Sequence, residues 1–214
     1  MGDGGFNFKG KVIKLQLAEK DLSQIEKFSI FTGKNYLKAS TLCLGKKFTS
    51  YQVTLCEKEK FQTLVEGFDI KERKTYNPPG DTFFNSDIDF VSCFIGLIDA
   101  DGHIGKAKLA KNPFIKIECH ECWSDFYMKL IEKINIYFGV SYVPNYRFDK
   151  KRNTFSLKIG NSSYFKILLK FIKDNNLPVL ERKWDKAIFP ERKLCKDGKE
   201  DGRGCHRSNL IFTV

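Results

Sequence analysis

The sequence predicts an α+β protein made of two similar halves. Three observations lead to this fold class: one order of strand and helix patterns occurs twice, a Pro-Pro-Gly stretch separates the two copies, and a strongly apolar helix pattern opens the second copy. The 214 residues are enough for two domains of about 100 residues, each with a core of its own. We therefore expect an internal duplication.

The first copy starts with the sequence GDGG at residues 2–5. Alternation of apolar and polar residues predicts its strands, and apolar residues at helical spacing predict its helices. In chain order, the expected elements are a strand at residues 11–17, a helix at 19–28, a hairpin at 36–55 and a helix at 59–68. The sequence KERKTY then ends the copy, so we place the first repeat at residues 1–76.

A linker is expected at residues 77–85, because its Pro-Pro-Gly sequence can continue neither a helix nor a strand ladder. The second repeat follows at residues 86–190 with the same order of elements. These are a strand at residues 113–119, a helix at 124–138, a hairpin at 141–159 and a helix at 162–175, followed by the sequence LERKWD. Residues 191–214 form a polar, Gly-rich tail to which we assign no function.

The helix that opens the second repeat is apolar on nearly all sides, which predicts a buried helix. Ser86 and Asp89 resemble a capping box at its start. Its apolar residues are Ile88, Val91, Ile95 and Ile98, with Phe90, Cys93, Phe94 and Leu97 on the other faces. Gly96 costs about 1 kcal/mol inside a helix, so we expect a partner helix to pack closely there. The end of the helix then delivers Asp99 and Asp101 to the same seam.

The composition favours a polyanionic partner. The chain has 37 Lys and Arg residues against 26 Asp and Glu residues, a formal net charge of +11, so nucleic acid is the first partner to consider. Its hydrophobic content of 42% is that of a folded protein. No apolar run reaches the roughly 20 residues of a membrane span, so no membrane partner is expected.

The seven cysteines are irregularly spaced, which is more typical of reduced thiols than of a disulfide framework. A zinc site is the alternative, because Cys119 and Cys122 have CxxC spacing and could be joined by Cys195, Cys205 and His206. However, Cys119 also continues the alternation of a strand, and the later cysteines lie in the Gly-rich tail. We therefore favour cysteines that bind no metal.

The nine residues FIGLIDADG, at positions 94–102, resemble the motif of the LAGLIDADG homing endonuclease family, with Phe94 and Ile95 in place of the first Leu and Ala. The resemblance extends over residues 2–190. It implies two αββαββα repeats, with the motif helices side by side at their interface and a saddle of two curved antiparallel sheets over the DNA major groove. In the first copy only MGDGG remains of the motif, so the first motif helix is expected to be missing.

The resemblance also implies a metal site in each repeat, because the last acid of each motif binds a divalent cation in this family. Alignment of MGDGG with DADGH places Asp3 with Asp101, and Gly4 with Gly102. The metal ligands implied are Asp3 and Asp101, with the neighbouring Gly2 and Ala100. The expected cofactor is Mg²⁺ or Mn²⁺, which would activate water and offset charge on the phosphodiester.

A basic residue near the metals is a further feature of the family. Each repeat ends with Glu-Arg-Lys, at residues 72–74 and 181–183. We therefore expect Lys74 and Lys183 to be catalytic, with Arg73 and Arg182 beside them.

Strand alternation and basic turns predict the nucleic-acid surface, because residues of one parity point away from the core. Lys, Arg, Gln and Asn are suited to base edges, and turn lysines can reach phosphates. The expected contact residues are Lys14, Gln16, Lys46, Lys47, Gln52, Lys116, Asn145, Arg147, Lys150, Lys151, Arg152 and Lys158.

Two functions from different classes stay open on the sequence. The first is a metal-dependent endonuclease that cuts a specific site in double-stranded DNA. The second is an RNA-binding protein without cleavage, such as an intron maturase or a component of a ribosomal or splicing assembly. Because the first motif is incomplete, we expect an upstream segment, a second polypeptide that supplies the helix, or a loss of cutting. The abundance of Lys and Phe suits an AT-rich organelle genome, so a mitochondrial or chloroplast location is expected.

Overall fold

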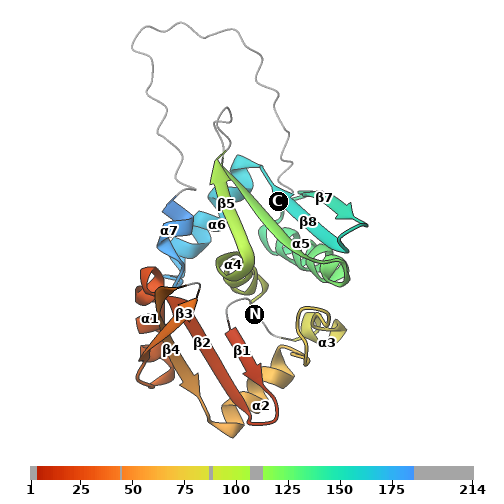
Figure 1. Ribbon diagram of the computed structural model, residues 1–214. Helices are drawn as coiled ribbons and strands as arrows, with labels where there is room; N and C mark the ends of the chain where they lie inside the picture. Colours follow the sequence, from red (N-terminus) through yellow and green to blue (C-terminus); the bar gives the residue numbers. More distant parts are fainter. Residues whose placement is uncertain (1–3, 44, 87–88, 107–112, 186–214) are drawn as a thin grey trace, which may run out of the picture.

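The computed structural model describes residues 4–43, 45–86, 89–106 and 113–185. Figure 1 shows two halves, each with a sheet and its helices, and α4 (Phe90–Asp101) between them. The predicted α+β class is confirmed, because each half contains a four-stranded antiparallel sheet. Among the described residues, no helix is both long and apolar enough to cross a membrane.

The two sheets have the same strand order, as an internal duplication requires. The first sheet has the order β1-β2-β4-β3, with β1 (Gly4–Asn7), β2 (Val12–Ala18), β3 (Leu37–Cys43) and β4 (Lys46–Leu55). The second has the order β5-β6-β8-β7, with β5 (Gly102–Lys106), β6 (Pro113–His120), β7 (Asn145–Asp149) and β8 (Thr154–Ile159). The duplication is therefore a property of the fold as well as of the sequence.

The pairing registers of the two sheets also correspond. Paired residues form the row Gly4, Leu15 and Val53 in the first sheet, and the row Gly102, Ile117 and Leu157 in the second. Gly4 and Gly102 therefore hold equivalent positions at the start of the first strand of each half, as the sequence alignment predicts.

The helices follow the same order in both halves. The first half contains α1 (Leu22–Thr32) and α2 (Lys58–Gly67), and the second contains α5 (Ser124–Phe138), α6 (Ser162–Asp174) and the short α7 (Glu181–Trp184). Short 3₁₀ turns, η1 (Glu19–Asp21) and η2 (Glu121–Trp123), lead into α1 and α5. Both α1 and α5 stop at a glycine with positive φ, Gly33 at 66° and Gly139 at 61°, a conformation that glycine adopts without strain.

The start of α4 differs from the predicted capping box. Asp89 is itself the N-cap, and its Oδ1 accepts hydrogen bonds from the backbone N–H groups of Val91 (3.0 Å) and Ser92 (3.1 Å). The Ser86 hydroxyl instead donates to the carbonyl of Phe83 at 2.6 Å. The Asp89 carboxylate alone accepts from two backbone N–H groups of the first turn. The helix therefore starts at Phe90, three residues later than a capping box with Ser86 at the N-cap implies.

The region predicted as a linker contains a short helix, α3 (Asp81–Phe84). Residues 77–80 have no regular structure, as the prolines and glycine predict. Phe83 and Phe84 are buried and belong to the core of the second half. Burial of a phenylalanine ring stabilises the folded state, whereas a ring in an exposed linker contributes nothing. The end of the predicted linker is therefore part of the second half.

Candidate active site and nucleic-acid interface

The two acids at the end of α4 have different environments. Asp99 is buried, with 8% of its surface exposed, and its two carboxylate oxygens accept hydrogen bonds from Leu180 N (2.9 Å) and Trp184 Nε1 (2.7 Å). Burial raises the pKa of Asp99, while these two hydrogen bonds oppose the rise. Asp101 is exposed. Asp99 therefore anchors the end of the second half, and Asp101 is the acid that can meet a ligand.

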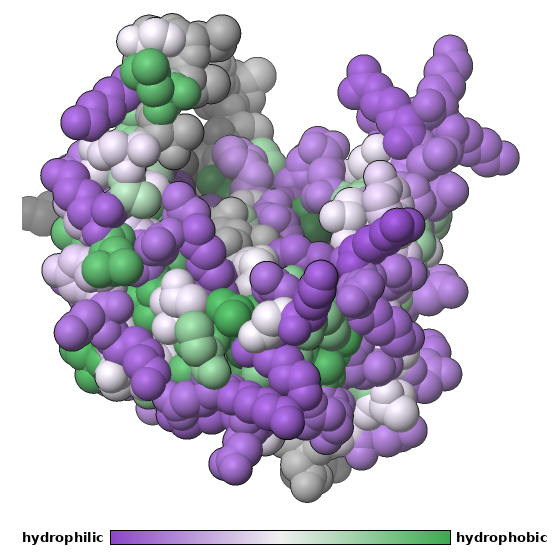
Figure 2. All heavy atoms as spheres, turned by 60° about the horizontal axis from the view of Figure 1, so that its bottom comes forward, coloured by the Kyte–Doolittle hydropathy of each residue, from purple (hydrophilic) through white to green (hydrophobic). Residues whose placement is uncertain are grey.

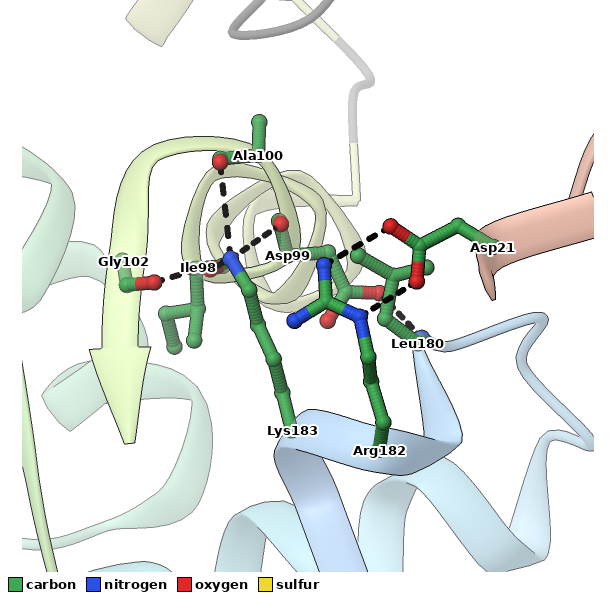
Figure 3. Close-up of polar contacts among 8 residues, drawn as sticks. All are labelled: Asp21, Ile98, Asp99, Ala100, Gly102, Leu180, Arg182 and Lys183. Carbon is green, nitrogen blue, oxygen red and sulfur yellow. Dashed lines mark hydrogen bonds and ion pairs between the residues drawn. The ribbon is translucent and has the colours of Figure 1, made fainter. Parts of the chain in front are cut away.

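Lys183 binds the backbone at the end of α4. Its Nζ donates to the carbonyls of Ile98 (3.1 Å), Ala100 (3.4 Å) and Gly102 (2.8 Å), and to that of Asp99 (Figure 3). An ammonium is favourable there, because carbonyls without helical partners and the negative end of the helix dipole meet at this point. The catalytic role of Lys183 stays a prediction, and the structure places its ammonium on these carbonyls.

Arg182 connects the two halves. Its Nη2 lies 2.8 Å from Asp21 Oδ2, and its Nε donates to the other carboxylate oxygen (Figure 3). Asp21 belongs to the first half and is 5% exposed. Two parallel bonds between a guanidinium and a buried carboxylate fix distance and orientation, so this pair holds the halves together.

Asp101 lines a pocket of about 240 Å³ to which both halves contribute. Lys74 and Thr75 come from the end of the first half, and the second half supplies the rest of the wall. Those residues are Glu118, Cys119 and His120 of β6, Trp123 of η2, and Leu97 and Tyr127. Lys74 and Asp101 thus line the same pocket, although the lysine comes from the other repeat, and the catalytic role of Lys74 stays a prediction.

The position of Lys74 depends on a contact between the halves. The indole Nε1 of Trp123 donates to the carbonyls of Lys74 and Thr75, each at 3.1 Å. Tyr76 stacks edge to face on His120 with ring centroids 4.9 Å apart. Arg73 has φ of 53°, which turns the chain just before the lysine. Together these contacts attach the end of the first repeat beside Asp101.

Sequence reasoning did not identify Glu118 and His120 as pocket residues. They lie near Asp101 because Gly102 pairs with Ile117, which sets the residue before the glycine beside Glu118. Burial, and to a lesser degree the charges of Cys122 and Asp101, raises the pKa of Cys119 to about 12, so its thiol is protonated at neutral pH. Glu118 and His120 can be recognised as pocket residues only when the pairing register of β5 and β6 is known, and the sequence does not provide this register.

The second sheet presents a polar, basic face. Five of the predicted contact residues surround one depression of about 680 Å³ on this face. They are Lys116, Asn145, Arg147, Arg152 and Lys158, joined by Glu118, Tyr146, Asp149, Thr154 and Ser156. Lys150 and Lys151 are exposed in the adjoining turn. Figure 2, in which the bottom of Figure 1 is turned toward the viewer, shows hydrophilic side chains over much of that surface as well.

The first sheet presents a similar but less continuous face. Lys14 pairs with Thr54, and Gln16 pairs with Gln52, so these side chains share one side of the sheet as predicted. Gln16 Nε2 also donates to Ser50 Oγ at 2.8 Å. Of the two predicted turn lysines, Lys47 is exposed in β4 and lies five residues from Gln52, so it points to the opposite face of the sheet. The side chain of Lys46 lies outside the described part of the structure.

Several predicted ligands lie outside the described residues, namely Gly2 and Asp3 of the first metal site and Cys195, Cys205 and His206 of the alternative zinc site. Within the described part of the chain, no group of three or more His, Cys, Asp and Glu side chains is arranged to hold a metal. Asp101 and Glu118 line the same pocket, and the Glu118 carboxylate also pairs with Lys116 Nζ at 2.6 Å. Mg²⁺ takes one or two protein carboxylates and completes its shell with water and phosphate oxygens, so the chemistry of these two side chains suits this cation.

Comparison with solved structures confirms the fold. The homing endonuclease I-WcaI, solved bound to its DNA recognition sequence, aligns with a TM-score of 0.60 at 14% identity, over 88% of this chain and 82% of its own. I-SmaMI, bound to uncleaved DNA with calcium ions, aligns with a TM-score of 0.44 at 15% identity, over 85% and 81%. WhiA from Thermatoga maritima aligns with a TM-score of 0.48 at 14% identity, over 86% and 54%. No protein-family model and no curated protein matches the sequence.

Proposed function

We propose that this chain binds double-stranded DNA and hydrolyses its phosphodiesters with Mg²⁺ or Mn²⁺, as a site-specific endonuclease. One observation carries the proposal: Glu118 lines both the Asp101 pocket and the basic depression of the second sheet, so the two sites adjoin. A DNA backbone held on the basic face would therefore pass the carboxylate. The similarity in fold to a homing endonuclease that was solved with DNA supports the same function.

The residues divide the work by position. Exposed Arg147, Arg152 and Lys158 would neutralise phosphates, and Asn145 can read a base edge. Asp101, with Glu118 beside it, would hold the cation. When bound, the cation supplies Lewis acidity and an activated water. Lys74 lines the same pocket with its ammonium on the carbonyl of Gly4, and a movement of this side chain toward Asp101 would let it offset charge on the cleaved phosphate.

The decisive variant is Asp101→Asn. We expect it to reduce Mg²⁺-dependent cleavage of a randomised target library by about a thousandfold, because a metal contributes several kcal/mol to catalysis. DNA affinity should stay within about tenfold, since phosphate contacts supply most of it. Asp125→Asn, an exposed acid on α5, is the matched control and should cut normally. Full activity of Asp101→Asn would place the metal elsewhere.

The basic face is tested by the salt dependence of binding. Arg152→Ala and Lys158→Ala should each lower the slope of log affinity against log salt by about 1, which is the loss of one phosphate contact. Lys170→Ala, an exposed lysine on α6, should leave the slope unchanged. If no variant cuts DNA and the wild type prefers structured RNA, the non-cleaving alternative replaces the endonuclease proposal.

A further inference from the structure

The outer part of the first sheet presents two large apolar side chains on the face turned away from the helices. In β4, Val53 is fully buried in a cluster with Ile25 of α1, so residues of the opposite parity point away from the core. Phe48 has this opposite parity and is 54% exposed. Leu37 of β3 pairs with Gln52, which also has this parity, and Leu37 is 62% exposed. Because paired residues of neighbouring strands lie on one side of a sheet, Leu37 and Phe48 share a face.

This face also carries predicted nucleic-acid contacts of the first half. Gln16 pairs with Gln52, and Gln52 pairs with Leu37, so these side chains form one row across the sheet. The next row consists of Ala18, Ser50 and Ala39. The predicted polar contacts therefore continue directly into an apolar area toward the β3–β4 hairpin.

The equivalent part of the second sheet is charged. The partners of Leu37 and Arg147 hold equivalent positions in β4 and β8, so Leu37 occupies the position of Arg147. By the same register, Ala39 occupies the position of Asp149. Arg147 is exposed, as Leu37 is. The two outer strands therefore offer different chemistry at matching places of a duplicated fold.

This difference matters because of what base pairs display in the major groove. A guanidinium can bind the O6 and N7 acceptors of guanine with two hydrogen bonds. Leucine and phenylalanine have no such donors, and the apolar group that they can contact on a base edge is the C5-methyl group of thymine. Contact with this methyl removes apolar surface of both partners from water, which is favourable.

We propose that the first sheet recognises thymine through its C5-methyl group, with Leu37 and Phe48 as the contact residues, whereas the second sheet reads its half of the target by hydrogen bonds. This inference rests on the proposed binding of double-stranded DNA. It makes the target asymmetric in the kind of contact as well as in sequence. It also makes the face selective for DNA, because uracil lacks the methyl group.

The test removes thymine methyl groups from the DNA. A duplex that binds the protein is first selected from a randomised library in EDTA, which prevents metal-dependent cleavage. Deoxyuridine then replaces thymidine in one half of this duplex at a time. In one half the affinity should fall about tenfold, since each buried methyl contributes roughly fourfold. In the other half it should stay within about twofold, since hydrogen bonds read that half.

Variants assign the sensitive half of the duplex to the first sheet. The double variant Leu37→Ala with Phe48→Ala should bind the thymidine and deoxyuridine duplexes equally well, because the methyl contacts are gone. Arg147→Ala should weaken binding and keep the tenfold difference, which is an effect of about the same size as in the wild type. Ile30→Ala with Phe31→Ala is the matched control, because both residues are exposed apolar side chains of α1, on the helical side. This control should behave as the wild type does.

A change of specificity is the sharper readout. Leu37→Arg copies the equivalent residue of the second sheet, so selection with this variant should replace thymine by guanine at one position of the target. Unchanged selection by Leu37→Arg would contradict the proposal. Equal affinity of the wild type for all the duplexes would overturn this inference and leave DNA binding intact, whereas absence of any DNA binding would overturn both. A dimer in light scattering that the double variant dissociates would identify the face as a protein interface and would also overturn the inference.

Discussion

The two halves of this protein share strand order and register but differ in how their cores are closed. In the second half, α4, α5, the sheet and the α3 phenylalanines form one buried cluster. In the first half, the buried residues form two clusters of three, on either side of an apolar groove. The same topology therefore carries a continuous core in one case and an interrupted core in the other.

The difference shows what a single buried helix contributes to this fold. α4 is apolar on nearly all sides, so it can cover its own sheet and still present Gly96 and its neighbours to the other half. Among the described residues, the first sheet is covered by α1, which contacts β2 and β4, and by α2, which contacts β2, and the groove lies beside them. A sheet needs a complete second layer to bury its apolar face.

The largest expected effect comes from truncating matched phenylalanines in the two cores. Phe94→Ala, in α4, should lower the free energy of unfolding by about 4 kcal/mol, because it leaves a cavity in a closed core. Phe61→Ala, in the first half, should cost about 2 kcal/mol, because its cluster is small and borders open space. Urea unfolding followed by circular dichroism measures both. Equal losses would contradict the contrast between the halves.

A smaller effect is expected from Asp99→Ala, which removes the acceptors of Leu180 N and Trp184 Nε1. We expect a net loss of about 2 kcal/mol, since two buried donors lose their partners while the cost of burying a carboxylate disappears. Trp184 fluorescence should shift to the red. Asp89→Ala, at the N-cap of the same helix, is the control and should cost about 1 kcal/mol without a fluorescence change. An unshifted spectrum in Asp99→Ala would show that this acid does not hold the last helix.

The smallest effect is a pH dependence. Burial raises the folded-state pKa of Asp99, so the folded protein binds this proton more tightly than the unfolded chain does. The contribution of Asp99 to stability is therefore full below its unfolded pKa, about 3.9, and is lost as pH rises through the folded pKa. Compared with Asp99→Asn, which does not titrate there, the wild type should lose stability over this interval. If the free energies of unfolding of the wild type and of Asp99→Asn changed with pH in parallel, the result would be inconsistent with a raised pKa of Asp99.

Much of the fold could be predicted because its signals are local. The strand and hairpin positions follow from alternation, and the equivalence of Gly4 with Gly102 follows from the repeated sequence around them. Gly96 predicts the side of α4 that faces the other half, and this side lines the groove between the halves. The predicted partner helix is not found at Gly96 among the described residues, and Gly96 is exposed beside the groove. The packing of the two halves against each other decides this outcome, and no local pattern of the sequence encodes it.

The sequence by itself determined the duplication, the apolar helix and the two acids at its end. It also determined which alternate positions of the second sheet carry polar and basic side chains, because periodicity and composition are properties of short segments. Tertiary structure alone decided the roles of these residues. It buried Asp99 under Trp184, left Asp101 open, placed Lys183 on backbone carbonyls, and brought Lys74 across from the other half. These outcomes depend on contacts between residues 15 to 85 positions apart, such as Gly102 with Ile117 and Asp99 with Trp184, which only the packed chain creates.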